Sequence, residues 1–185
     1  MKLSVSNRGA EKKSTKNLMR EKGDIPAVLY SKEKDSQLLA VNGAEFHAIL
    51  RKIQKGHLPT TVIELEGEGV KVKVIVKDIQ YEPTTYDIMH LDFLELNEKT
   101  QISVNVPIEC TGAAECEGIK LGGFLRQVIR HLRVRCFPKD LPNMFSVDVR
   151  ELSIKQAKRI KDIVMPKGVE PLAQLNEVVV LIAKR

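Results

Sequence analysis

His90 and Asp92 lie two positions apart in the segment YDIMHLDF, so an imidazole and a carboxylate could act together. Such a pair could take part in acid–base catalysis, bind a metal ion, or form a hydrogen bond on the surface of a strand. Residues 88–96 alternate between apolar and polar side chains, which predicts a β-strand. Residues i and i+2 of a strand share one face about 7 Å apart, so we expect the pair to be exposed or in a cleft.

Catalysis and metal binding need further groups that the sequence does not supply in a recognisable pattern. A hydrolase needs a nucleophile or a third orienting group, and zinc needs at least a third ligand. GxSxG, HExxH and P-loop patterns are absent, and His47, His57 and His131 stand alone. We expect no enzymatic activity, no metal site, no cofactor and no small-molecule substrate. A small hydrolase using His90 and Asp92 is a rival hypothesis, which requires a cleft and a third polar group.

The chain is basic, with 30 lysines and arginines against 24 acidic residues. The positive charge gathers in residues 1–30, with seven basic and three acidic residues, and in residues 120–139, with six basic and none acidic. Two such segments are typical of a protein that lies along phosphates. Tryptophan is absent and other aromatic residues are few, so we favour folded RNA over unpaired bases as the partner.

The length and hydropathy of the chain indicate a two-domain cytoplasmic protein with no membrane contact. No segment has the run of about 18 uncharged apolar residues that a membrane helix needs, and the N-terminus lacks the apolar block of a signal peptide. A chain of 185 residues can form two small domains. The polar stretch at residues 97–101 is the predicted boundary, which gives domains over residues 1–96 and 97–185.

The first domain shows the patterns of a small β-barrel with two helices. We predict a short helix over residues 14–23, ended by a glycine, and a longer one over residues 42–56, where Asn42 and Glu45 suit a capping box. Asp24 and Pro26 are expected to break the chain between the first helix and the second strand. Alternation or short apolar runs predict strands over residues 3–8, 27–30, 38–41, 60–81 as a hairpin, and 88–96.

The second domain is predicted to be rich in strands as well. Glycine and proline separate four apolar or alternating segments, at residues 102–110, 131–136, 145–149 and 177–183. Residues 118–130 are ambiguous, and residues 153–164 suit either a short helix or a turn. The expected fold class is mainly β with a few short helices: an N-terminal antiparallel β-barrel followed by a second β-rich domain.

A third interpretation of His90 and Asp92 accounts for the basic surroundings. A carboxylate next to phosphates is unfavourable unless it accepts hydrogen bonds from the amino or imino groups of bases, so Asp92 is a candidate base reader. His90 can donate a hydrogen bond to a phosphate or a base. This interpretation requires the N-terminal basic segment to lie beside strand 88–96. We expect that contact if the barrel closes its first strand region against its last.

The segments GDIPAVLY and VKDIQYEPTTYDIMHLDF resemble the bacterial large-subunit ribosomal protein twenty-five family, which binds 5S ribosomal RNA. The second half, with LGGFLRQVIRHLRVRCFPKDLPNMFSVDVREL and MPKGVEPL, is similar to the long form of that family, also called general stress protein Ctc. The resemblance covers nearly the whole chain. It implies a barrel that lies against loop E of 5S RNA, in the central protuberance of the large subunit, beside other ribosomal RNA and proteins.

The resemblance also implies which residues lie on the RNA face. Carried over position by position, they are Arg8, Lys13, Arg20, Tyr30, Lys77, His90 and Asp92. Lys16 joins Arg8, Lys13 and Arg20 as an expected phosphate contact. In this interpretation His90 and Asp92 read or brace base edges, and Tyr30 packs against the backbone.

The first helix departs from the family pattern. The family commonly has Gly-Lys-Gly followed by Ser-Arg-Arg-Leu-Arg, whereas this chain has EKKS followed by KNLMR. Asn17 and Leu18 therefore replace two arginines, and nearby lysines lack the planar fork of arginine. A rival hypothesis is a stress-linked accessory or protein-binding module with weakened 5S RNA binding. Convergence of the expected contact residues on one face would favour the 5S hypothesis.

The second basic segment supports two interpretations. Arg126, Arg130 and Arg133 could form a second contact with RNA, because the run around them contains no acidic residue. Their spacings of four and three residues would also suit one solvated face of a short helix, which would need no ligand.

Overall fold

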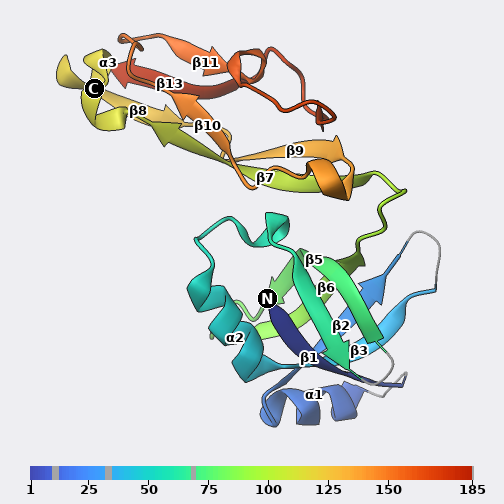
Figure 1. Cartoon of the computed structure of the whole chain (residues 1–185). Helices are drawn as coiled ribbons and strands as arrows, with labels where there is room; N and C mark the ends of the chain where they lie inside the picture. Colours follow the sequence, from blue (N-terminus) through green and yellow to red (C-terminus); the bar gives the residue numbers. More distant parts are fainter. Residues whose placement is uncertain (10–12, 32–34, 68–69, 185) are drawn as a thin grey trace. The chain divides into compact units, whose positions relative to one another are not determined.

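The computed structural model of the chain describes residues 1–9, 13–31, 35–67 and 70–184 (Figure 1). The chain divides into two compact units, Met1–Thr100 and Gln101–Arg185. Both are built mainly of strands, so the expected fold class is confirmed. In the part of the chain that the structure describes, no helix is long and apolar enough to cross a membrane.

The first unit is a closed barrel of six strands, in the order β1-β3-β2-β6-β5-β4. Four of its neighbouring pairs are antiparallel, but β1 with β4 and β2 with β6 are parallel, so the barrel is mixed rather than wholly antiparallel. The strands are β1 (Lys2–Asn7), β2 (Asp24–Tyr30), β3 (Gln37–Asn42), β4 (Ile63–Gly67), β5 (Val70–Tyr81) and β6 (Ile88–Glu95). The helices are α1 (Lys13–Glu21), α2 (Gly43–Lys52) and the short 3-10 helix η1 (Leu58–Thr60).

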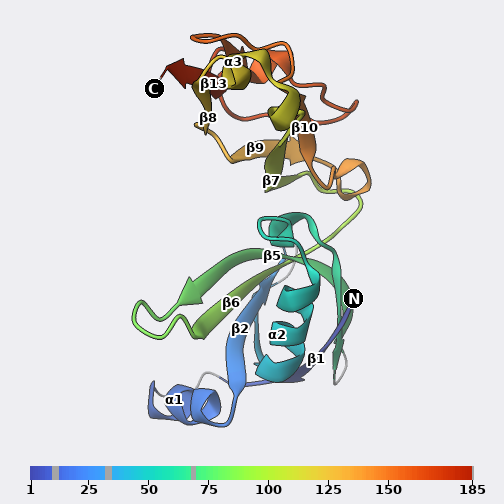
Figure 2. The ribbon, with the colours of Figure 1, turned by 90° about the vertical axis from the view of Figure 1, so that its left-hand side faces the viewer.

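The barrel does not close its first strand against its last, which was the condition set for contact between the N-terminal basic segment and strand 88–96. The first strand, β1, pairs with β3 and β4, whereas the last strand, β6, lies between β2 and β5. The β4–β5 hairpin separates the two, because its outer strand β4 pairs in parallel with β1. The N-terminal basic segment reaches β6 by another route, through helix α1, which contacts β2 (Figure 2).

Strand β2 begins three residues earlier than the sequence suggested. Asp24 and Pro26 do not break the chain but belong to the strand, where Pro26 pairs with Ala40 of β3. The parallel pairing with β6 starts only at Ala27, opposite Leu91. Pro26 has no N–H to donate, but β2 is not yet paired with β6 at this position. The strand therefore loses no hydrogen bond to β6 and tolerates the proline. Gly23, which has a φ of 89°, ends the preceding helix as predicted.

Helix α2 places its apolar face in the barrel core. Phe46 and Ile49 are buried among the barrel residues, as helical periodicity predicted. The Oδ1 atom of Asn42 accepts a hydrogen bond from the backbone N–H of Glu45 at 3.2 Å, which confirms the cap. The Glu45 carboxylate does not complete the capping box. It accepts hydrogen bonds from the backbone N–H of Ser4 at 2.9 Å and from its hydroxyl at 3.1 Å, and so ties the helix to β1.

We expect Gly43→Ala to destabilise the first unit by about 1–3 kcal/mol, since a Cβ atom at this position would overlap the carbonyl oxygen of Gly23. That oxygen is backbone, and it accepts a hydrogen bond from the Gly43 N–H at 3.1 Å, so it cannot move freely. Tyrosine fluorescence during urea unfolding would report on this unit alone, because all three tyrosines lie in it. Gly9→Ala is the control, since a Cβ there meets nothing within 4 Å. Equal unfolding midpoints for the two variants would contradict the prediction.

The second unit consists of two sheets around its own core. One has the strand order β10-β7-β9-β12 and the other β11-β13-β8. The strands are β7 (Ile102–Thr111), β8 (Gly123–Gln127), β9 (His131–Cys136), β10 (Phe145–Asp148), β11 (Ala157–Arg159), β12 (Glu170–Pro171) and β13 (Val178–Lys184). The helical segments are η2 (Ala113–Glu115), α3 (Glu117–Lys120), η3 (Pro138–Asp140) and η4 (Ile160–Asp162). Buried core residues include Val104, Leu132, Val134, Val180 and Ile182.

The four strands predicted for this unit are confirmed as β7, β9, β10 and β13. The ambiguous segment at residues 118–130 contains the end of α3 and then strand β8. Residues 153–164 form no α-helix; they hold strand β11 and the 3-10 helix η4. Strand β11 is only three residues long, too short to show an alternation that could be separated from a helical spacing.

Candidate nucleic-acid interface

His90 and Asp92 form a hydrogen-bonded pair on β6. The Nδ1 atom of His90 lies 2.8 Å from Oδ1 of Asp92, and 22% and 31% of their side-chain surfaces are exposed. The buried neighbours Leu91 and Phe93 point into the barrel, so the alternation along the strand places the pair on its outer face. An Nδ1–H that donates to Asp92 leaves Nε2 of the ring and Oδ2 of the carboxylate for other partners.

A second aspartate lies beside this pair. Asp92 pairs with Val28 of β2 on one side and with Asp78 of β5 on the other, and paired residues share one face of a sheet. Gln80 is paired with His90 in the same way. Asp78 and Gln80 were not anticipated from the sequence. The outer surface formed by Tyr30, Asp78, Gln80, His90 and Asp92 is called the β2–β6–β5 face below.

Tyr30, at the end of β2, is partly buried next to the two carboxylates. Burial raises the pKa of its hydroxyl, and the negative charges of Asp92 and Asp78 raise that pKa further. The hydroxyl therefore keeps its proton at neutral pH and can act as a hydrogen-bond donor. The Tyr30 hydroxyl is an uncharged donor, and the carboxylates of Asp92 and Asp78 are acceptors. This part of the face can therefore form hydrogen bonds with both acceptor and donor groups of a ligand.

Lys77 occupies a break in the register of β5. The ladder with β6 shifts between Val76 and Asp78, so Lys77 is the extra residue of a β-bulge. Val76 is buried, while Lys77 and Asp78 are both exposed. The bulge thus turns Asp78 outward and adds a lysine at the edge of the β2–β6–β5 face.

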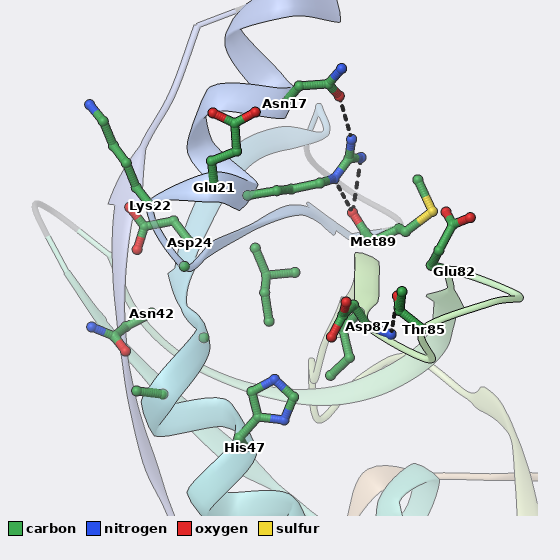
Figure 3. A pocket seen from close by; sticks show the side chains of 16 residues that line it. Asn17, Glu21, Lys22, Asp24, Asn42, His47, Glu82, Thr85, Asp87 and Met89 are labelled. Atoms are coloured by element: carbon green, nitrogen blue, oxygen red, sulfur yellow. Dashed lines mark hydrogen bonds between the residues drawn. The ribbon is translucent and has the colours of Figure 1, made fainter.

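Arg20 anchors helix α1 to the barrel. Its Nε and Nη2 atoms donate to the carbonyl oxygen of Met89 at 3.2 and 3.1 Å, and Nη1 donates to Oδ1 of Asn17 at 3.0 Å (Figure 3). The Met89 carbonyl belongs to the peptide bond that precedes His90. Asn17, which replaces a family arginine, orients the guanidinium of Arg20. The helix packs against β2 and is bonded to β6 through Arg20, whereas β1 does not pair with β6.

Arg8 is also engaged by the barrel. Its Nε donates to the carbonyl oxygen of Leu39 at 2.9 Å and its Nη2 to that of Ala27 at 3.4 Å. Its Nη1 atom is buried, and it has no hydrogen-bond partner within the residues that the structure describes. These carbonyls belong to strands β3 and β2, so Arg8 holds the chain just after β1 against these two strands.

The residues expected on the RNA face fall into three groups. Tyr30, Lys77, His90 and Asp92 lie on or at the edge of the β2–β6–β5 face. Arg8 and Arg20 are attached to the same strands by hydrogen bonds to backbone oxygens. Lys13 and Lys16 belong to α1, and their side chains lie outside the described part of the structure. The structure thus places four of these residues on the β2–β6–β5 face or at its edge, and it bonds Arg8 and Arg20 to strands of the same barrel.

A pocket of about 680 Å³ lies near this face but does not include the histidine–aspartate pair. It is lined by the end of α1, the start of α2 and the segment between β5 and β6 (Figure 3). Its charged residues are Arg20, Glu21, Lys22, Asp24, Glu82 and Asp87, so carboxylates outnumber cations. The cleft that the hydrolase hypothesis requires beside His90 and Asp92 is therefore not this pocket, and an excess of carboxylates does not favour phosphate either.

The residues of the second basic segment lie in three different places. Arg126 is on β8, Arg130 is in the connection that follows, and Arg133 is on β9. The interpretation of these arginines as one face of a short helix is therefore wrong. Alternation along β8 and β9, not a helical repeat, determines which side chains are exposed.

Together, the mixed barrel with its polar outer face and the second β unit define a two-domain, mainly β protein. Comparison with known proteins gives its family. Residues 3–93 match the model described as "Ribosomal L25p family", and residues 101–185 match "Ribosomal protein TL5, C-terminal domain". The chain belongs to the ribosomal L25p family, in a two-domain form. Membership of a ribosomal protein family identifies it as a structural protein and not an enzyme.

Relatives match this chain from end to end. The "Large ribosomal subunit protein bL25" of Chlamydia muridarum (strain MoPn / Nigg) is 44% identical over 185 residues, which is 100% of both chains. The protein of the same name from Chlamydia trachomatis serovar L2 is also 44% identical over 100% of both chains. The one from Chlamydia caviae is 43% identical over the same extent.

Proposed function

We propose that this chain is a structural constituent of the large ribosomal subunit, located on the ribosome in the cytoplasm, and that its barrel binds 5S rRNA at loop E in the central protuberance. The names of the relatives and the family support the ribosomal role. The observation that carries the RNA-binding part is the His90–Asp92 pair, which sits beside Tyr30 and the anchored helix α1 on one side of the barrel.

Asp92 has the central role in this proposal. Its Oδ1 is occupied by His90, so Oδ2 accepts from an amino or imino group of a base in the widened groove. His90 is held by the same bond, with Nε2 directed to the RNA side for a base or a phosphate. The hydroxyl of Tyr30 donates to the sugar–phosphate backbone, because its raised pKa keeps it protonated.

Basic side chains position the RNA on this face. Phosphates near His90 and Asp92 are contacted by three lysines: Lys13 and Lys16 on α1, and Lys77 at the bulge. Arg20 uses part of its guanidinium group on the barrel and has further N–H groups for a phosphate. Arg8 has a buried Nη1 atom, so it contributes mainly by its positive charge and by holding the chain after β1. The grouping of Tyr30, His90 and Asp92 on one face, with Arg20 bonded to the strand that carries the pair, favours 5S binding over the hypothesis of an accessory module with weakened binding.

Binding to two RNAs tests the proposal. We expect the native chain to prefer a 5S fragment containing loop E over a plain RNA duplex of equal length by at least about tenfold, because only loop E presents base edges to Asp92. Filter binding or fluorescence anisotropy over a range of salt concentrations would measure both affinities. Equal affinity for the two RNAs at every salt concentration would overturn the proposal for the barrel, although membership of the family would stand.

A further inference from the structure

The second unit carries most of the net charge of the chain. Residues 101–185 hold 14 lysines and arginines against 9 acidic residues, whereas residues 1–100 hold 16 against 15. Five of the six net positive charges therefore lie outside the barrel that we propose as the 5S-binding unit. Charge of this size on a separate unit indicates an anionic partner of its own.

Four arginines of this unit have guanidinium groups without a partner among the described residues. Arg150 of the same unit bonds Glu115 at 3.0 Å, and Arg159 donates to the carbonyl of Asn176 at 3.3 Å. No hydrogen bond or ion pair joins the guanidinium groups of the other four to any residue that the structure describes. All four are exposed, and they fall within ten consecutive residues: Arg126, Arg130, Arg133 and Arg135.

Strand β9 places two of these arginines on one face. Its burial alternates, so that His131, Arg133 and Arg135 are exposed while the residues between them are buried. On the neighbouring strand β7, Asn105 is opposite Arg133 and Ser103 is opposite Arg135. These five residues are called the β9 face. Its guanidinium groups come from positions i and i+2, about 7 Å apart along an extended strand.

Three charged residues lie close to the β9 face in the structure or in the sequence: Glu170, Arg130 and Arg126. Glu170 of β12 is opposite Arg135, but no ion pair joins the two in the described structure. Arg130 lies in the connection just before β9 and is exposed, so it adds a further positive charge near that end of the strand. Arg126 belongs to the other sheet, where it pairs with Leu181 of β13, so it is not part of this face. The β9 face therefore forms a short cationic row with polar neighbours rather than a diffuse charge.

We propose that the β9 face binds the sugar–phosphate backbone of an RNA helix without regard to sequence. The guanidinium group of arginine can donate two parallel hydrogen bonds to two oxygens of one phosphate. Small polar side chains, such as those of Asn105 and Ser103, can form hydrogen bonds with phosphates and 2′-hydroxyls. The face has no phenylalanine, tyrosine or tryptophan on which a base could stack, and His131 is its one aromatic ring among the five residues. The proposal goes beyond the 5S contact, because it concerns the other unit and does not depend on loop E.

Binding of the full chain to a fluorescent plain RNA duplex tests this proposal, with and without a saturating unlabelled loop E fragment. We expect Arg133→Gln combined with Arg135→Gln to weaken duplex binding by about tenfold or more at low salt. The slope of log affinity against log salt is expected to fall by about two, one for each phosphate interaction that the variant removes. Preference for loop E, measured on the same variant, is expected to stay as in the native chain.

Two control variants distinguish binding by the β9 face from a general effect of the net positive charge of the unit. Lys161→Gln with Lys167→Gln removes the same charge from exposed positions elsewhere in the unit and is expected to change duplex binding little. Arg133→Lys with Arg135→Lys keeps the charge and is expected to retain the salt slope while losing part of the affinity. Equal duplex binding by the Gln variant and the Lys161/Lys167 control would overturn the proposal, because the β9 face would then contribute no more than other exposed charges of the unit. Loss of loop E preference alone would overturn only the proposed function of the barrel.

Discussion

Asp92→Asn is expected to remove most of the preference for loop E and to leave binding to a plain duplex almost unchanged. The substitution keeps an oxygen that can accept from His90 Nδ1, so the ring should hold its position. Its amide NH2, in place of Oδ2, cannot accept a hydrogen bond from a base amino group. A base contact of this kind contributes about 1–3 kcal/mol of discrimination, which corresponds to a loss of about fivefold to 150-fold in loop E affinity.

Asp78→Asn is the matched control for this prediction. Asp78 lies opposite Asp92 in the β5–β6 ladder, so the control removes one negative charge from the same face. If Asp92 acts by accepting a hydrogen bond from a base, Asp78→Asn should keep the preference and bind both RNAs slightly more tightly, because repulsion from phosphates is reduced. A similar loss of preference in both variants would mean that charge, and not base reading, explains the effect.

The alternation of the sequence was sufficient to predict β6, the strand that carries His90 and Asp92. His90 and Asp92 were predicted to share an outer face because their spacing is the strand repeat, and the structure places them there. The helix cap at Asn42 could be predicted for a similar reason, since the bond to Glu45 is local. Features that depend on one or a few neighbouring residues were therefore accessible from the sequence alone.

Features that depend on long-range pairing were not accessible. The parallel pairing of β1 with β4 joins residues about sixty positions apart, and nothing in either strand encodes the choice of that neighbour over β6. The position of Asp78 was missed because the bulge at Lys77 reverses the phase of β5. The adjacent polar residues Lys77 and Asp78, which interrupt the alternation of VKVKVIVKDIQY, were the available signal of that bulge.

The roles of the arginines show a further limit of sequence analysis. Arg8 and Arg20 were expected to be phosphate contacts because of their charge, but both also bond backbone carbonyls of the barrel. Arg133 was grouped with Arg126 by a spacing that would suit a helix, although β8 and β9 belong to different sheets. Charge predicts that arginines bind acceptors, but only the fold determines whether those acceptors belong to the chain or to a ligand.

Arg20→Ala is expected to lower both the stability of the first unit and the affinity for loop E. The variant loses both hydrogen bonds to the Met89 carbonyl and the bond to Asn17, so we expect a loss of about 1–3 kcal/mol in the free energy of unfolding. Tyrosine fluorescence during urea unfolding would measure it. Helix α1 would no longer be held against β6, so the interactions of Lys13 and Lys16 with phosphates would weaken together with that of Arg20 itself.

The salt dependence separates the two roles of Arg20. If the Arg20 side chain binds a phosphate directly, Arg20→Ala lowers the slope of log affinity against log salt by about one. If Arg20 only holds α1 in place, the slope changes by less than this once the affinity is corrected for the fraction of folded protein. Asn17→Ala is the matched control, because it removes the bond that orients the guanidinium but keeps the charge. We expect this control to lower stability by less than about 1 kcal/mol and to preserve the slope. An Arg20→Ala variant that unfolds at the native midpoint would contradict the anchoring role and leave Arg20 as a phosphate ligand only.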